Sequence, residues 1–313
     1  MRSYLLFLVL LLLSGCLLFS RIYQFQVEAP TSYSVHNLNT GLNYTTIQEA
    51  IDANETTDGN TILVDAGIYY QAVTVNKSIS LVGADRNTTI LDGNFTIYTL
   101  INITASNTKI SNFTIMSSTF GIRWILNVSN IEVSDNVFTQ ISWAGVYAGS
   151  NGRIVDNFMD NNSNCIGTYG GNNITIVGNT MTHSSAAAVA FSYAGSTQPN
   201  IVWSNNFINN SSPIYNYKSA TNLNSDYPVG GNYWSDYKGT DKYSGPYQNE
   251  SGSDGIGDTP YIPDNSTYNT AYPVDYYPLM HPIPEFPSFL ILPLSFITTL
   301  IGVIFYRKRM TRS

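Results

Sequence analysis

The chain has 313 residues, of which 43% are hydrophobic and only 11% charged, and its formal net charge is -7. This length and apolar content suffice for a sizeable buried core, whereas the shortage of cations excludes an extended basic surface for nucleic acid. Uncharged polar residues dominate instead, and about fourteen Asn-x-Ser/Thr sequons would be N-glycosylation acceptors in an exported chain. Among these sequons are Asn87, Asn94, Asn102, Asn112, Asn127 and Asn173.

Residues 1–22 begin with Met1-Arg2 and continue as an apolar run to Phe19, which predicts a signal peptide or an N-terminal anchor. Leu13-Ser-Gly-Cys16 resembles a lipobox, in which Cys16 would be lipidated, but the apolar run continues past Cys16 and favours the other two alternatives. With Cys16 in the leader, Cys165 is alone in the mature chain, so we expect no intrachain disulfide and a small buried thiol. Residues 23–40 predict a polar spacer.

A short amphipathic helix is predicted next. Thr46 and Glu49 have the spacing of a capping box, and Ile47, Ala50 and Ile51 lie on one helical face. Such a helix would cover the open end of a stacked β structure and protect its strand edges. Residues 61–64, 73–75, 79–82 and 88–91 then read as the first strands.

One phrase recurs between residues 110 and 208, as in Ile-Val-Asp-Asn-Phe-Met and Ile-Val-Gly-Asn-Thr-Met. The aligned positions are Phe113, Asn136, Asn157, Asn179 and Asn206, which are 23, 21, 22 and 27 residues apart. Apolar residues alternate on both sides of each position, which predicts strands and excludes helical repeats. We therefore predict an all-β parallel β-helix over residues 41–214. Asn136, Asn157, Asn179 and Asn206 would form its internal hydrogen-bonded ladder, and Phe113 would replace the amide in the first coil.

The periodicity stops near residue 215. Residues 215–282 are rich in Gly, Tyr, Asp and Pro and predict a C-terminal cap that covers the last coil with Tyr233, Trp234, Tyr237 and Tyr243. Residues 283–306 include an uncharged run long enough to cross a bilayer, and the basic tail 307–313 follows. By the positive-inside rule the tail is cytoplasmic, so residues 30–282 are expected on the extracellular face of the membrane.

The coil phrase resembles the repeat of pectin-lyase-like proteins and of the NosD family. Residues 44–53, 61–69 and 76–83 are similar to the family's opening, and residues 231–237, 254–261 and 277–280 to its close. The resemblance implies a right-handed parallel β-helix with an N-terminal capping helix, flanked here by terminal hydrophobic helices. Pro284-Glu-Phe286 with the following span resembles the C-terminal sorting signals of archaeal surface proteins, so the span is either an anchor or a removable signal.

Enzymes on this fold need grouped carboxylates, with a cation as base in the lyases. Asp135 and Asp156 occupy equivalent places in successive coils, and Arg123 is a nearby cation, but no complete catalytic set is recognisable. The NosD resemblance implies copper, for which His183 beside Met181 is the best neighbourhood, although it lacks grouped soft ligands. Asp254 and Asp258, with Asp241, place oxygen atoms around a Gly-rich loop, which leaves two alternatives: a Ca²⁺ site that holds the cap together, or a plain polar turn.

Exposed aromatic residues on a β-helix would stack on sugar rings, and Trp143, Tyr147 and Tyr169 are the candidates in the coils. The favoured hypothesis is a tethered surface protein that binds glycans or surface-layer components without catalysis. Two alternatives stay open: a copper-binding accessory factor, and a polysaccharide lyase or hydrolase.

Overall fold

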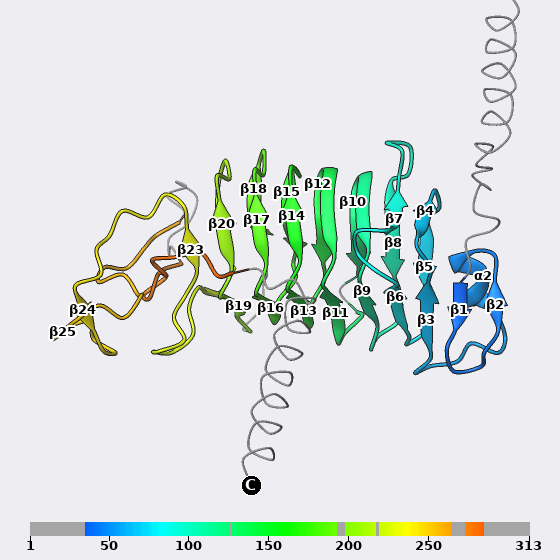
Figure 1. Ribbon diagram of the computed structural model, residues 1–313, viewed down its shortest axis with the longest axis horizontal. Helices are drawn as coiled ribbons and strands as arrows, with labels where there is room; N and C mark the ends of the chain where they lie inside the picture. Colours follow the sequence, from blue (N-terminus) through cyan, green and yellow to red (C-terminus); the bar gives the residue numbers. More distant parts are fainter. Residues whose placement is uncertain (1–34, 126, 193–197, 217–218, 264–272, 285–313) are drawn as a thin grey trace, which may run out of the picture.

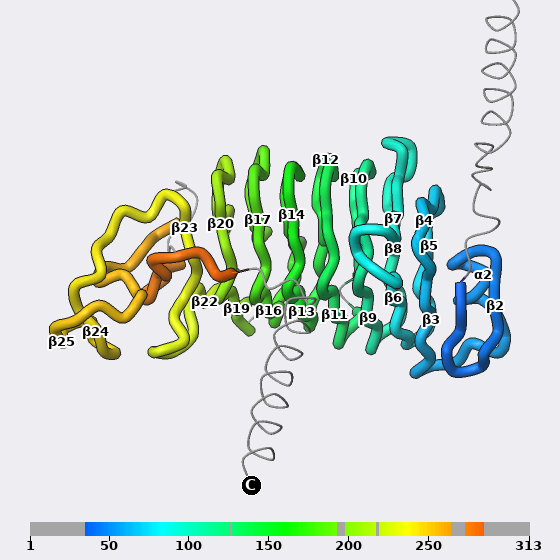
Figure 2. Tube along the Cα trace, in the orientation of Figure 1, coloured from blue at the N-terminus to red at the C-terminus, as the bar shows by residue number. Residues whose placement is uncertain are grey.

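The computed structural model describes residues 35–125, 127–192, 198–216, 219–263 and 273–284. Its strands stack coil upon coil as a right-handed parallel β-solenoid, with the helix α2 (Ile47–Asp52) at one end and an irregular cap at the other (Figure 1). The parallel β-helix predicted from the repeat is thus confirmed. In the tube view the coils from β10 (Thr114–Trp124) to β20 (Asn206–Ile208) run side by side along similar paths (Figure 2), as expected when outward and inward residues keep their places from coil to coil.

Two large sheets build the solenoid. The first has ten strands in the order β2-β1-β3-β6-β9-β11-β13-β16-β19-β22, parallel from β3 onward. Its bounds are β1 (Val35–Asn37), β2 (Asn43–Tyr44), β3 (Thr61–Val64), β6 (Ser80–Gly83), β9 (Lys109–Ser111), β11 (Ile131–Ser134), β13 (Gly152–Val155), β16 (Ile174–Val177), β19 (Asn200–Trp203) and β22 (Thr221–Asn222).

The second sheet has thirteen strands. Most coils contribute two segments to it, one on each side of a bend in the sheet. Its bounds are β4 (Gly67–Tyr69), β5 (Val73–Val75), β7 (Thr89–Asp92), β8 (Thr99–Ile103), β10 (Thr114–Trp124), β12 (Val137–Ala148), β14 (Phe158–Asp160), β15 (Asn164–Tyr169), β17 (Thr180–Thr182), β18 (Ala187–Ser192), β20 (Asn206–Ile208), β21 (Ile214–Asn216) and β23 (Tyr233–Trp234). A hairpin of β24 (Tyr243–Ser244) and β25 (Glu250–Ser251) completes the cap.

The coils turn at three corners, each marked by a column of residues with positive φ. The columns are Asn112, Asp135, Asp156, Gly178 and Ser204; Ser117, Gln140, Asn161, His183 and Asn209; and Asn107, Asn130, Asn151 and Asn173. Left-handed backbone suits Asn, Asp and Gly better than other residues, so the polar repeat phrase is a corner signal. Between the corners, apolar side chains such as Ile110, Val133 and Ile154 fill one continuous core.

The N-terminal cap forms as its sequence predicts. Thr46 is the N-cap of α2, its hydroxyl accepts a hydrogen bond from the Glu49 amide at 3.1 Å, and Ile47, Ala50 and Ile51 are buried. Part of the predicted spacer is ordered as β1, whose antiparallel pairing with β3 ends the sheet. Antiparallel closure and the helix together leave little open edge for another chain to pair with.

An internal asparagine ladder runs along one corner, and its last members differ from the prediction. The amide oxygens of Asn157 and Asn179 each accept from the backbone and side chain of the Asn one coil earlier, at 2.9–3.2 Å. The next member is Asn205, not Asn206 as predicted, because Val177 pairs with Trp203 and so aligns Asn179 with Asn205. The ladder then extends to Asn232, inside the predicted cap.

The C-terminal cap covers the last coil with stacked rings. Trp234 lies on Phe207 with ring centroids 4.3 Å apart, and Tyr261 packs against Trp234 at 4.9 Å, whereas the predicted Tyr243 is exposed. Both sheets continue past residue 214, in β22 and β23. The two predicted terminal hydrophobic segments lie outside the described residues. Within the ranges that the structure describes, no helix is long and apolar enough to cross a membrane.

Candidate functional site

The two sheets present different outer faces. On the first sheet Lys109, Glu132 and Arg153 sit side by side in successive strands, with ammonium and guanidinium 3.6 and 3.8 Å from the carboxylate. On the second sheet and its turns, large hydrophobic side chains reach solvent. In the coils that the structure describes, these are Ile68, Tyr70, Phe95, Tyr98, Ile125, Trp143 and Tyr215. Exposed aromatics gathered on one face indicate an interaction surface.

Four aromatic rings and one cation form a cluster on this face, which we name the aromatic patch: Tyr98, Phe120, Trp143, Tyr147 and Arg123. Phe120 is its centre and is only 8% exposed, with Tyr98, Trp143 and Tyr147 at centroid distances of 5.3, 6.4 and 5.1 Å. The Arg123 guanidinium lies 5.9 Å from the Phe120 ring and 5.8 Å from the Tyr147 ring. Tyr98 and Trp143 remain largely exposed, so the patch offers ring surface to solvent.

Strand register assembles the patch from three coils. Arg123 of β10 pairs with Asn102 of β8 and with Tyr147 of β12, so these outward residues stand in one row. A register shift between Ser118 and Phe120 places Phe120 under the neighbouring rings. Three predicted residues are therefore brought together. Arg123 was a candidate for catalysis, whereas Trp143 and Tyr147 were candidates for stacking on sugar rings. Tyr169 is the last residue of β15, beside Ser192 of β18, and its side chain is not described.

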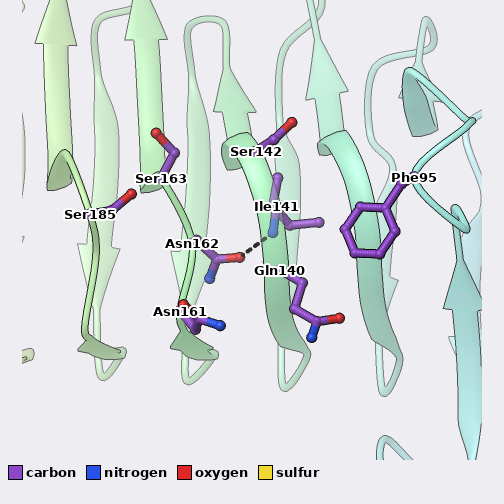
Figure 3. A pocket seen from close by; sticks show the side chains of 8 residues that line it. All are labelled: Phe95, Gln140, Ile141, Ser142, Asn161, Asn162, Ser163 and Ser185. Atoms are coloured by element: carbon purple, nitrogen blue, oxygen red, sulfur yellow. Dashed lines mark hydrogen bonds between the residues drawn. The ribbon is translucent and has the colours of Figure 1, made fainter.

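A shallow pocket of about 350 Å³ adjoins the patch, and we name it the polar groove. Its lining residues are Phe95, Gln140, Ile141, Ser142, Asn161, Asn162, Ser163 and Ser185 (Figure 3). The Ile141 amide donates to Asn162 Oδ1 at 3.0 Å, which repeats the ladder design at a second corner. Ser142 of the groove and Trp143 of the patch are consecutive exposed residues of β12, so the two surfaces meet at this point of the strand.

Phe95 forms one wall of the groove, although its backbone conformation and its exposed ring do not favour folding. It is 71% exposed and has a φ of 55°, and Asn94 before it has a φ of 46°. Left-handed backbone at a residue with a bulky side chain costs roughly 1–2 kcal/mol, and exposing the ring contributes nothing to folding. In this conformation the Phe95 amide donates to the Ser117 carbonyl at 2.8 Å, and the ring that stays exposed on the groove indicates an interaction position.

Of the three predicted catalytic residues, the two aspartates lie side by side, but Arg123 does not join them. Asp135 and Asp156 are exposed at adjacent positions of one corner, just before β12 and β14, whereas Arg123 lies beside the far end of β12. Partial burial, and then the charge of Asp135, raise the pKa of Asp156. The Asp156 carboxylate occupies the space that a side chain at Gly178 would need.

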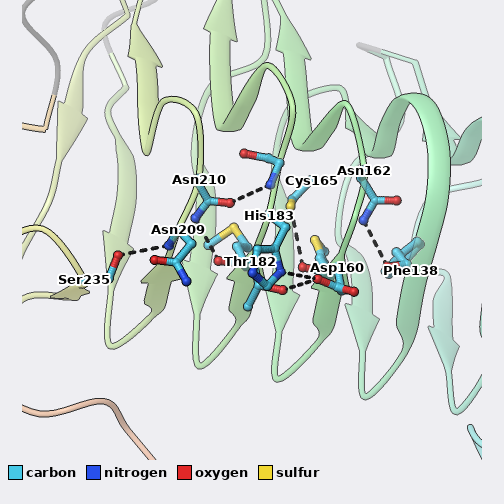
Figure 4. Close-up of polar contacts among 12 residues, drawn as sticks. Phe138, Asp160, Asn162, Cys165, Thr182, His183, Asn209, Asn210 and Ser235 are labelled. Carbon is cyan, nitrogen blue, oxygen red and sulfur yellow. Dashed lines mark hydrogen bonds and ion pairs between the residues drawn. The ribbon is translucent and has the colours of Figure 1, made fainter.

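His183 and Met181, the predicted copper neighbourhood, face opposite ways. Met181 is fully buried in the core, while His183 is exposed and its Nδ1 lies 2.8 Å from Asp160 Oδ1 (Figure 4). Partial burial raises the pKa of Asp160, but hydrogen bonds from Thr182 and His183 outweigh it and hold the pKa below its usual value. The buried Cys165 thiol approaches the Met159 carbonyl and has a strongly raised pKa because of desolvation.

The three aspartates of the predicted calcium site serve as acceptors for backbone amides. Asp241 accepts from the amides of Asp254 and Gly255 at 3.0 and 2.8 Å, and Asp258 accepts from those of Lys242 and Tyr243. Across the described ranges no three His, Cys, Asp or Glu side chains converge as a metal site. The calcium site stays a prediction that metal analysis would test.

Comparisons with known proteins give a partial match. No family model matches the chain. A cell surface glycoprotein of Methanothermus fervidus is 38% identical over 102 residues, which is 33% of this chain and 17% of that protein, so the chain spans less than a fifth of the relative's length. Among solved structures, carrot pectin methylesterase has a TM-score of 0.43 at 14% identity, over 54% of this chain and 60% of that one. Pectin methylesterase PemA from Erwinia chrysanthemi has a TM-score of 0.34 at 13% identity, over 60% and 88% of the two chains.

Proposed function

We propose that this protein is a cell-surface β-solenoid that binds glycans or neighbouring surface components, without catalysis, through the aromatic patch and the polar groove. The observation that carries the proposal is the half-exposed Trp143, 53% open to solvent, held against Phe120 beside a row of hydroxyls and amides. A sugar ring offers C–H groups on its face and hydroxyls at its edge, so it matches an aromatic face next to polar side chains.

The surface location is supported by the relative from Methanothermus fervidus, which is named a cell surface glycoprotein. It agrees with the export segment predicted at residues 1–22 and the anchor or sorting segment predicted at residues 283–306. Membrane attachment through the latter segment is part of the proposal. Fractionation of cells that express the full chain, with protease added from outside, tests it: the solenoid should stay with the membrane and be accessible.

Binding is tested with the full chain on a glycan array, followed by calorimetry on any sugar retained. Trp143→Ala should weaken binding by about tenfold or more, equivalent to about 1.4 kcal/mol, because it removes the exposed ring. Tyr247→Ala is the matched control, since Tyr247 is 84% exposed but lies in the C-terminal cap. Equal affinities in the two variants, or no retained glycan at all, would contradict the proposal.

The same samples separate the alternative functions. Release of sugars or unsaturated products that Asp135→Asn or Asp156→Asn abolishes would make the protein an enzyme. Stoichiometric copper that His183→Ala removes would make it a copper-binding factor. We expect neither result, because the acidic pair is exposed away from the aromatic patch and Met181 is sealed in the core.

A further inference from the structure

We propose that Asn94 carries an N-linked glycan and that this glycan lies in the polar groove, against the aromatic patch of the same molecule. The inference rests on the proposed function in that it names a ligand of the same surface. It differs in the source of the sugar, which is the chain itself and not a partner.

Asn94 is open for modification. It begins the sequon Asn94-Phe95-Thr96 and lies in the turn between β7 and β8, where both Asn94 and Thr96 are exposed. Within the described part of the chain the Asn94 amide side chain makes no hydrogen bond; only its backbone N–H is used, donating to Asp92 Oδ1 at 2.8 Å. An N-glycan needs an exposed Asn side chain at a surface turn, and Asn94 meets this requirement.

The turn is fixed to the following coil. The amide of Gly93 donates to the Met116 carbonyl at 2.9 Å, and the amide of Phe95 donates to the Ser117 carbonyl at 2.8 Å. Gly93 is required for this approach, since a Cβ there would lie 2.4 Å from the Ser117 oxygen. Asn94 stands between these two anchors, so a sugar attached to it starts from a defined point.

That point is the rim of the polar groove. Phe95, the next residue, forms the groove wall opposite Gln140, Ile141 and Ser142, and its ring faces the groove in Figure 3. A sugar on Asn94 would cover the exposed Phe95 ring, and its hydroxyls would meet the Ser and Asn side chains of the following coils. The strained backbone and the exposed ring of Phe95 would then serve to seat the first sugar.

One other sequon, Asn161-Asn-Ser163, also lies at the groove, where Asn161 is a lining residue, and the same peptide map reads its occupancy. The sequons at Asn173, Asn102 and Asn87 lack this combination. The Asn173 side chain already donates to Asn151 Oδ1 at 2.9 Å, and Asn102 lies within β8 beside Arg123. Asn87 is exposed like Asn94, but it belongs to the turn between β6 and β7, at a different corner from the groove. Asn87 therefore serves as the matched control.

The test compares the full chain made in a host that N-glycosylates exported proteins with the same chain made in a host that does not. Glycopeptide mass mapping reads the occupancy of Asn94. Acrylamide quenching of tryptophan fluorescence reads the patch, because Trp143 is the exposed one of four tryptophans, with Trp124 and Trp234 buried and Trp203 only partly exposed. The same measurement on Trp143→Phe variants gives the quenching of the other three tryptophans, which is subtracted to leave that of Trp143.

We expect an occupied Asn94 and loss of Trp143 quenching in the glycosylated chain. Asn94→Gln and Thr96→Val should both restore quenching, since both destroy the sequon by different changes, whereas Asn87→Gln should leave it low. An unmodified Asn94 peptide, or an occupied Asn94 with unchanged Trp143 quenching, would overturn the inference.

Failure of this inference is distinguishable from failure of the proposed function. If the unglycosylated chain binds free glycans through Trp143 but Asn94 is never modified, the proposed function stands and the inference fails. If the Asn94 glycan shields Trp143 but no free glycan binds the unglycosylated chain, the inference stands and the surface serves its own sugar alone.

Discussion

Two adjacent asparagines provide a sharp test of how the solenoid is held together. Asn205 is a ladder member: its side chain donates to the Ile176 and Trp203 carbonyls and to Asn232, each at 2.9 Å, and accepts from the Asn179 amide and side chain. Asn206 is also buried, but its amide group bonds only to the Thr180 hydroxyl and to the backbone of Ile283, which is partly exposed.

The two alanine variants should therefore differ although both remove a buried amide. Asn205→Ala leaves the buried Asn179 N–H without an acceptor and breaks four further hydrogen bonds, which we expect to lower the free energy of unfolding by about 3–5 kcal/mol. Asn206→Ala should lower it by only about 1–2 kcal/mol, because water can solvate the groups of Ile283.

Urea unfolding followed by far-ultraviolet circular dichroism measures both values under identical conditions. Equal losses, or a larger loss in Asn206→Ala, would refute the argument that the ladder passes through Asn205.

Three further predictions concern single buried or crowded groups. Burial outweighs the hydrogen bonds from Asn232, Trp234 and Tyr277 and raises the pKa of Asp275 from 3.8 to about 6. The folded chain thus binds this proton more tightly than the unfolded chain, so Asp275 favours folding below about pH 4, and about 3 kcal/mol is lost as the pH rises through 6. Unfolding free energies of the wild type minus those of Asp275→Asn should show this slope, and a flat difference would contradict it. Gly178→Ala should destabilise the chain by at least about 1–2 kcal/mol, because φ is +71° and a Cβ would lie 1.9 Å from Asp156 Oδ1; Asp156→Ala should relieve part of the loss in a double-mutant cycle, and strict additivity would count against the clash. The Cys165 thiol, buried and with a raised pKa, should react with a thiol reagent only as fast as the chain opens, and rapid labelling of the native protein would disprove its burial.

The coils could be predicted from sequence because two local signals coincide in them. Apolar alternation marks the strands, and a polar residue that tolerates left-handed backbone marks each corner. The sequence alone does not place the last ladder position, because Trp203-Ser-Asn-Asn-Phe207 offers two adjacent asparagines and only the pairing of Val177 with Trp203 distinguishes them. It does not indicate Asn232 either, because the segment before Asn232 carries no repeat phrase.

The aromatic patch was only half predictable. Trp143 and Tyr147 are recognisable as aromatics in a strand. Phe120 is not, since the register shift between Ser118 and Phe120 breaks the alternation that distinguishes outward from inward residues, and Tyr98 lies in the turn before β8, where no alternation applies. The sequence does not predict that Phe95 forms a wall of the polar groove either. A positive φ at Phe95 contradicts local preference and is imposed by its hydrogen bond to the next coil.

The pairing of Asn206 with Ile283 also has a mechanical meaning. The described chain ends at residue 284, and its final segment is fastened to β20, the last coil before the cap. A pulling force on the residues that follow would act first on these two hydrogen bonds, before it reached the stacked rings of the cap. The force that the protein withstands would then depend on how fast these two hydrogen bonds break, and not on the total stability of the coils.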